Sequence, residues 1–267
     1  MSDTDSLGGK TGTRPTQAAR LNLFMKLLEE RGHCSITELA AHFDVSEETI
    51  RRDIRQLEGS GRVQKTHGGV SIPSNQLEAP YRIRLREQSE AKQRIAQHAA
   101  RMVHEGMTLL LDSGTTCFWL ARALAGLRDL TIITNSVEIA HEVVGRPGQR
   151  LFLAGGPIKP DYHAAFGPEA IAFCLRFVPD ITVMSMGAID GVRGFLDFDA
   201  DEAMFKRSLL DQSRRVVVLA DSTKFTKAGF IQVAGFADVR TLYTDAPPPE
   251  TVATAAQAHG MGIEVAD

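Results

Sequence analysis

Acidic, hydroxylated and glycine residues follow a short apolar run near the middle of the chain. The group is Asp112-Ser113-Gly114-Thr115-Thr116, and it stands directly before a helical pattern. Small residues in this position expose several backbone N–H groups, and the start of a helix favours negative charge. A phosphate group is therefore the expected occupant of this loop. The Asp112 carboxylate would accept hydrogen bonds from the hydroxyls of the same ligand.

Similar polar groups end the apolar runs that follow. They are Thr134-Asn135-Ser136, Gly155-Gly156, Gly187–Asp190, Asp221-Ser222-Thr223-Lys224 and Asp245. Ligands of open parallel sheets bind outside the carboxyl ends of the strands. A single polar strand end is weak evidence, because surface loops need turn residues in any case. Several in succession predict an effector site along one edge of a sheet.

Charged side chains elsewhere suit the same ligand. Lys206 and Lys224 would supply positive charge to a phosphate, and Asp190 and Glu202 would accept hydrogen bonds from hydroxyls. Nothing in the spacing indicates a metal site, a cofactor or a catalytic group. The chain has only three, widely spaced cysteines and no histidine cluster beside them, which argues against disulfides and zinc and fits a reducing, cytoplasmic setting.

A second set of chemically capable residues lies near the N-terminus. Ile50, Ile54 and Leu57 share one face of a helical pattern, which places the arginines Arg51, Arg52 and Arg55 on the other face. Ser46 is the expected N-cap, followed by acids in the first turn. Arginine reads guanine edges in the major groove by paired hydrogen bonds. A solvated charged face is the plainer alternative for any single arginine.

The elements around these arginines favour DNA binding. Two helical patterns and the tight link 44–46 precede them, which is the helix-turn-helix arrangement. A hairpin over 62–70 follows and would bring Arg62, Lys65 and His67 to phosphates as a wing. His67 is equally well explained as a simple turn residue.

The polar loops of the second half require a parallel sheet to bring them together. Six apolar runs are predicted as buried strands: Met107–Leu111, Leu130–Thr134, Arg150–Ala154, Ile181–Met186, Val216–Ala220 and Thr241–Thr244. Helical stretches separate most of them, which is typical of an α/β sheet covered on both faces. The chain of 267 residues, with net charge −3, has room for two domains.

We expect a disordered tail over 1–15, a winged helix-turn-helix domain over 16–74, a linker over 75–90 and an α/β effector domain over 91–267. No apolar run approaches the ~20 residues that span a bilayer, so no membrane association is expected.

The N-terminal motifs resemble the DeoR family of bacterial regulators. They are Glu38-Leu39-Ala40 with Phe43, Val45-Ser46-x-x-Thr49-Ile50-Arg51-Arg52-Asp53, and His67-Gly68-Gly69. The resemblance implies operator binding through Ser46, Thr49, Arg51 and Arg52, with support from Arg62, Lys65 and His67. It also implies a homo-oligomer, since paired half-sites need paired readers.

The second half resembles the effector domain of the same family, which is similar to ribose-5-phosphate isomerase. The motifs 196–207 and 244–249 resemble the glycerol-3-phosphate regulon repressors within it. Two departures stand out: Ser185–Asp190 lacks glycines of the family's turn, and Cys117 replaces a third threonine. The first leaves the ligand pose near Asp190 open.

The sequence therefore predicts a repressor of a sugar or polyol operon, released by a small phosphorylated metabolite such as glycerol 3-phosphate. One alternative is a sugar-phosphate isomerase or deaminase using Asp190, Glu202 and Lys206. It is disfavoured because 194–198 lacks the lysine of the isomerases. A regulator of a different phosphosugar, or of an unphosphorylated metabolite, is also compatible with these motifs.

Overall fold

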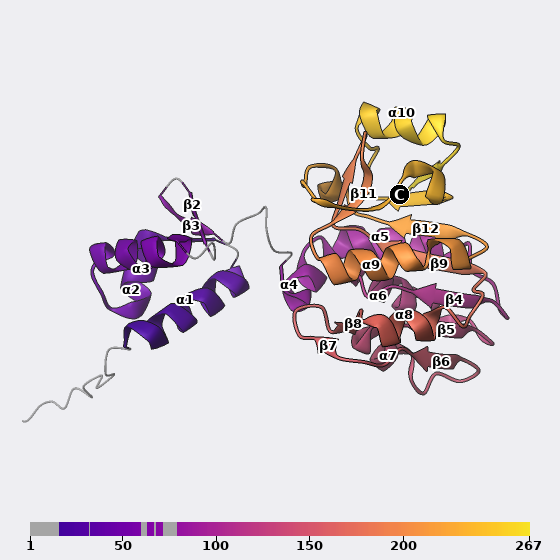
Figure 1. Ribbon diagram of the computed structural model, residues 1–267, viewed down its shortest axis with the longest axis horizontal. Helices are drawn as coiled ribbons and strands as arrows, with labels where there is room; N and C mark the ends of the chain where they lie inside the picture. The colour runs from indigo at the N-terminus through magenta and orange to yellow at the C-terminus, as the bar shows by residue number, and fades with distance from the viewer. Residues whose placement is uncertain (1–15, 32, 60–62, 67, 72–78) are drawn as a thin grey trace, which may run out of the picture. The chain divides into compact units, whose positions relative to one another are not determined.

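The chain folds into two compact units, Met1–Ser74 and Asn75–Asp267 (Figure 1). The computed structural model describes residues 16–31, 33–59, 63–66, 68–71 and 79–267. Two of the predicted DNA contacts, Arg62 and His67, and the tail expected over 1–15 lie outside these residues. Within the described ranges, no helix is long and apolar enough to cross a membrane.

The first unit is a winged helix-turn-helix, as predicted. Its elements are α1 (Gln17–Arg31), β1 (His33–Ser35), α2 (Ile36–Phe43), α3 (Glu47–Gly59), β2 (Gln64–Thr66) and β3 (Gly69–Ser71). Ser35 and Glu38 cap α2 reciprocally, and Asp44 ends it in the left-handed conformation that begins the tight turn. Strand β1, which the sequence pattern did not indicate, completes an antiparallel sheet in the order β1-β3-β2.

A buried ion pair fixes the third helix of this unit against the first. Arg20 Nε lies 2.6 Å from Asp53 Oδ2, and a second nitrogen of Arg20 lies 3.2 Å from Asp53 Oδ1. Asp53 is 1% exposed and stands beside Ile54, on the face opposite the predicted DNA contacts. The two-pronged contact therefore sets the orientation in which α3 presents its arginines.

The second unit is built on a seven-stranded parallel sheet in the order β15-β14-β12-β9-β4-β5-β6. Its strands are β4 (Thr108–Leu111), β5 (Thr131–Thr134), β6 (Arg150–Leu153), β9 (Ile181–Ser185), β12 (Val216–Leu219), β14 (Thr241–Thr244) and β15 (Gly262–Val265). All six predicted strands are present. The seventh, β15, was not predicted, because its short run mixes apolar residues with Gly262 and Glu264 and leaves most of them exposed.

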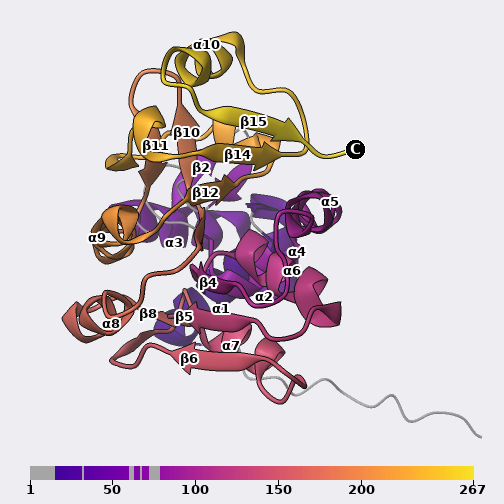
Figure 2. The ribbon, with the colours of Figure 1, turned by 90° about the vertical axis from the view of Figure 1, so that its right-hand side faces the viewer.

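Helices cover both faces of this sheet, as expected (Figure 2). Alternate residues of β4 enter two different cores, with Leu109 and Leu111 on one face and Leu110 on the other. Helices α5 (Ser89–Ala100), α6 (Thr115–Ala123) and α7 (Val137–Val143) pack on the first face. Helices α8 (Pro168–Cys174), α9 (Ala200–Ser208) and α10 (Glu250–Ala258) contribute to the second.

Smaller sheets flank the carboxyl ends of the strands. A three-stranded antiparallel sheet in the order β10-β11-β13 consists of β10 (Ala188–Asp190), β11 (Gly194–Asp197) and β13 (Ile231–Ala234). A short hairpin joins β7 (Ile158–Lys159) to β8 (Ala164–Ala165). Neither was predicted from the sequence, because strands this short carry little periodicity.

The prediction of a linker over 75–90 is wrong for the described residues 79–90. Residues Tyr81–Arg86 form helix α4, and α5 begins at Ser89. Tyr81 and Arg84, one helical turn apart, are 1% and 7% exposed and pack into the second unit. The backbone N–H of Tyr81 also donates to the carbonyl of Asp161. Because this segment is rich in charged residues, the sequence pattern did not indicate that one face of α4 is buried.

Candidate effector site and DNA-binding face

The loop between β4 and α6 lies against the end of β9, as the strand-end prediction requires. Asp112 is fully buried and accepts a hydrogen bond from the backbone N–H of Ser185 at 3.1 Å. A Cβ on Gly114 would lie 1.3 Å from Ser185 Oγ, so only glycine fits there. No side chain caps the N-terminus of α6. Its first N–H groups, at Thr115 and Thr116, are thus positioned to bind an anion.

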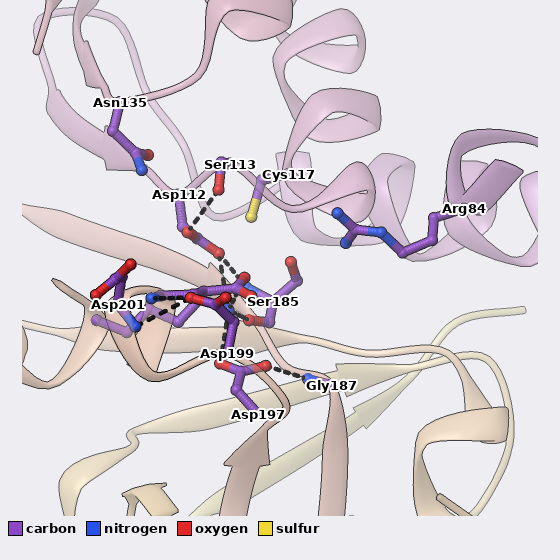
Figure 3. A network of polar contacts seen from close by, with 12 residues as sticks. Arg84, Asp112, Ser113, Cys117, Asn135, Ser185, Gly187, Asp197, Asp199 and Asp201 are labelled. Atoms are coloured by element: carbon purple, nitrogen blue, oxygen red, sulfur yellow. Dashed lines mark hydrogen bonds and ion pairs between the residues drawn. The ribbon is translucent and has the colours of Figure 1, made fainter. Parts of the chain in front are cut away.

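Lys206 of α9 holds the ends of three strands together, at Asp112, Ser185 and Asp197, and Figure 3 shows these three residues close to one another. Its ammonium lies 2.6 Å from the carbonyl of Ser185, 2.9 Å from Asp197 and 2.8 Å from Glu202. Asp112 is 3.5 Å away. Although burial disfavours the charge, the carboxylates of Asp112, Asp197 and Glu202 raise the pKa of Lys206 well above its usual range. We call these four charged residues the carboxylate–lysine cluster.

This geometry corrects the role expected of Lys206. An ammonium has three protons, and all three are donated to protein acceptors. Lys206 therefore organises the strand ends and has no proton left for a phosphate. Asp197, which was not predicted as a site residue, is 1% exposed and also accepts a hydrogen bond from the Gly187 N–H at 2.7 Å. Its place in the largely apolar stretch 194–198 carries no signal of its own, and only the fold brings it to the cluster.

The end of β5 contributes one buried polar atom that the protein leaves unsatisfied. Asn135 is fully buried and donates to the Ala165 carbonyl at 2.9 Å, while its Oδ1 has no partner among the described residues. Figure 3 shows its amide directed toward Asp112 and Ser113. Ser136 instead caps α7 through the N–H of Ile139. Asn135 is thus the member of this pair that is suited to contact a ligand.

The loop after β12 brings a cation to the same sheet edge. Asp221 is 1% exposed and accepts a hydrogen bond from the Thr223 N–H at 3.2 Å, which shapes the turn. The side chain of Lys224 is 9% exposed and forms no ion pair within the described part of the chain. A lysine without a counter-ion at this edge of the sheet is an attractive partner for an anion.

Two further cations, Lys92 and Arg84, belong to the same region, and neither was predicted from the sequence; the Lys92 ammonium donates to the Arg84 carbonyl. Lys92 of α5 is 3% exposed, and its pKa is lowered to about 8 by burial and then by the charge of Lys224, with Arg84 acting in the same direction. Arg84 lies over the rings of Tyr81 and Tyr162, and its guanidinium points toward the start of α6 (Figure 3). We call Arg84, Lys92 and Lys224 the cationic group.

Tyr81 adds an unsatisfied hydroxyl near these cations. Its side chain is buried, and its hydroxyl has no hydrogen-bond partner in the described ranges. Burial raises the pKa of Tyr81, so the group remains a donor at neutral pH. Arg84 and Cys117, at the start of α6, are close enough to influence that pKa. A ligand at the start of α6 would give the hydroxyl an acceptor.

Three of the predicted contacts, Asp190, Gly155 and Gly156, contribute no side chain to this site. Asp190 lies at the tip of the β10–β11 hairpin, where its carboxylate accepts hydrogen bonds from the N–H groups of Arg193 and Val192 at 2.7 and 2.9 Å. These bonds lower the pKa of Asp190 and use its side chain to form the turn. The glycines Gly155 and Gly156 follow β6, the strand at the edge of the sheet, and are exposed.

The predicted DNA-binding face is present on α3. Ile50, Ile54 and Leu57 are buried, while Arg51, Arg52 and Arg55 are exposed. Ser46 Oγ accepts a hydrogen bond from the Thr49 N–H at 3.2 Å and so caps the helix, and the Thr49 hydroxyl lies 2.9 Å from the same oxygen. Lys65 is exposed on β2, the first strand of the wing.

Comparison with known proteins gives matches over both units. Residues 20–76 match the DeoR-like helix-turn-helix domain, and residues 87–246 match the DeoR C terminal sensor domain. The glycerol-3-phosphate regulon repressor of Escherichia coli (strain K12) is 32% identical over 93% of this chain and 99% of its own length. The HTH-type transcriptional repressor CsqR of the same strain is 34% identical over 89% and 91%. Ribose 5-phosphate isomerase A from Methanocaldococcus jannaschii, at 16% identity, has a TM-score of 0.39 over 52% of this chain and 55% of its own.

Proposed function

Because this chain belongs to the DeoR family of regulators, we propose that it represses a sugar or polyol catabolic operon and leaves its operator when a small phosphorylated metabolite binds. The observation that carries the proposal is the pairing of two features. An exposed arginine face stands on a helix-turn-helix, and an uncapped helix start in the second unit lies with a group of nearly buried cations.

The phosphate of the effector is assigned to the start of α6 and the cationic group. Backbone N–H groups of Ser113–Thr116 would donate hydrogen bonds to the phosphate oxygens, and Lys224 would neutralise charge. The hydroxyls of the effector would face Asn135, Tyr81 and the carboxylate–lysine cluster. Glycerol 3-phosphate has the required phosphate and hydroxyls, and the name of a relative at 32% identity supports it. A different phosphosugar is the alternative that shares this chemistry.

The position of the cations suggests how effector binding influences the DNA-binding unit. Arg84 and Lys92 lie on α4 and α5, the first helices after the DNA-binding unit. An anion that draws them together therefore acts on the segment that continues from that unit. By linkage, effector and operator must lower each other's affinity by the same factor, typically about 5–150-fold for a coupling of ~1–3 kcal/mol.

Binding rather than turnover fits the chemistry of the site. An isomerase needs a mobile proton acceptor and a cation beside the substrate carbonyl. Lys206 donates all its protons to the protein. We also infer a homo-oligomer acting on DNA in the cytoplasm, because each chain carries one reading helix and operators are built of paired half-sites.

The test is an operator shift with an effector panel. Wild-type protein is used to select its preferred sequence from DNA flanking its own gene, and the complex is titrated with glycerol 3-phosphate, glycerol and phosphosugars. Release by a phosphorylated compound, with none by glycerol, is the expected result. Failure of every phosphorylated compound to release the operator would refute the effector assignment, and turnover of any of them would restore the enzyme alternative.

A further inference from the structure

The DNA-binding face carries acidic side chains among its basic side chains. Arg51 lies 2.8 Å from Glu47 and 3.9 Å from Glu48, and Arg55 lies 2.6 Å from Glu48. Lys65 of the wing forms an ion pair with Glu58. Of the predicted basic contacts that fall in the described ranges, Arg52 alone has no ion pair. The protein therefore meets DNA with most of these cations already neutralised.

Glu48 is distinguished from the other acids by its place on the helix. Glu48, Arg51, Arg52 and Arg55 are spaced i, i+3, i+4 and i+7, so they form one stripe along α3. Glu48 stands in the first turn, and the N-terminal residues of a recognition helix are those that contact base edges. Any DNA that meets the three arginines thus also meets the Glu48 carboxylate. Glu47, by contrast, is tied to Thr37 of α2 at 2.9 Å.

These ion pairs are weak enough to exchange. The side chains of Arg55 and Glu48 are 57% and 60% exposed, and exposed pairs contribute little to stability. Nonspecific DNA offers mainly phosphates. A phosphate can draw Arg55 away from Glu48 only by coming close to the Glu48 carboxylate, which then has no counter-ion. An operator can compensate, because a glutamate accepts a hydrogen bond from the amino group of cytosine in the major groove.

We propose that Glu48 is a specificity determinant, which suppresses binding to nonspecific DNA by holding Arg55 and accepts a hydrogen bond from a cytosine in the operator. The proposal rests on the DNA-binding function proposed above. Its effect is a difference between two affinities, so it is separable from the general contribution of positive charge.

The experiment compares full-length wild type with Glu48→Gln on two probes. One is a scrambled-sequence duplex of the same length as the operator, and the other is the operator selected by the wild type. Freeing one cation for a phosphate contact should strengthen scrambled-duplex binding about 5-fold at ~0.15 M salt and steepen the salt slope by about 0.9. Operator affinity should stay unchanged or fall, so the specificity ratio drops at least about 5-fold.

Two controls separate this role from others. Glu250→Gln removes the same charge from an exposed position on α10, in the other unit, and should leave both affinities unchanged. Thermal unfolding of Glu48→Gln checks that the helix start is intact. Equal strengthening on both probes, or no change on either, would overturn the role of Glu48. A wild type that selects no sequence at all would instead overturn the proposed DNA-binding function.

Discussion

Replacing Lys206 with methionine tests the carboxylate–lysine cluster most directly. The substitution keeps the apolar length of the side chain and removes the ammonium of a 1% exposed residue that bonds the Ser185 carbonyl, Asp197 and Glu202. Removing one partner from a buried ionic network costs about 3–5 kcal/mol. Native domains are stable by only about 5–15 kcal/mol, so the second unit should lose a large part of its stability.

Urea unfolding provides the assay, because the chain's one tryptophan, Trp119, lies on α6 of the second unit. With a slope of about 3 kcal/mol per molar urea, the loss lowers the midpoint by roughly 1–1.7 M. Lys224→Met is the matched control. Its side chain is also largely buried but forms no ion pair in the described structure, so little stability should be lost.

The pH dependence adds a second test of the same reasoning. The raised pKa of Lys206 means that its contribution is fully present below the ordinary lysine value and is lost only as pH rises through the higher folded value. The wild type should therefore show no loss from Lys206 between about pH 6 and 9. In Lys206→Met, the carboxylates left without a counter-ion become protonated as the pH falls, so the loss of unfolding free energy should become smaller toward about pH 5. A penalty below about 1 kcal/mol, constant with pH, would refute the ionic account.

Three more expectations follow from neighbouring contacts. Lys224→Met should weaken glycerol 3-phosphate binding at least about 10-fold in calorimetry while leaving operator affinity unchanged; normal affinity would remove Lys224 from the effector site. Because the pKa of Lys92 is lowered to about 8, the ammonium is lost between about pH 7 and 9, so effector affinity should fall over that range, and Lys92→Met should abolish the dependence. Asp53→Asn leaves Arg20 buried without its charged partner and should cost the first unit about 3–5 kcal/mol; operator binding should fail on warming while effector binding persists, and a melting curve identical to wild type would contradict this.

Six of the seven strands of the sheet were predictable because their apolar runs are continuous, and Thr241–Thr244 was located to the residue. The site was only partly predictable. Asp112 and Asn135 follow strands directly, and parallel pairing brings such ends together whatever the rest of the fold does. Asp190 ends a strand of the side sheet instead, where the hairpin carries it away from the cluster. Periodicity does not distinguish these two kinds of strand.

Arg84 and Lys92 escaped prediction for a different reason. Both lie in a charged stretch, and charge normally marks a solvated surface. Here they are 7% and 3% exposed, and the sequence pattern gives no sign that these charged side chains lie inside the second unit. The lowered pKa of Lys92 shows that its surroundings disfavour a positive charge.

That unfavourable charge is itself informative about the ligand. Burial and the neighbouring cations Lys224 and Arg84 act against the Lys92 ammonium, while Asp221 and Glu87 favour it. A dianion placed among the three cations would remove the repulsion and raise the pKa of Lys92, so binding should take up protons near about pH 8. An uncharged sugar would leave the repulsion in place. Calorimetry of glycerol 3-phosphate in two buffers of different ionisation enthalpy distinguishes these cases: proton uptake is expected, and its absence would show that the phosphate lies elsewhere.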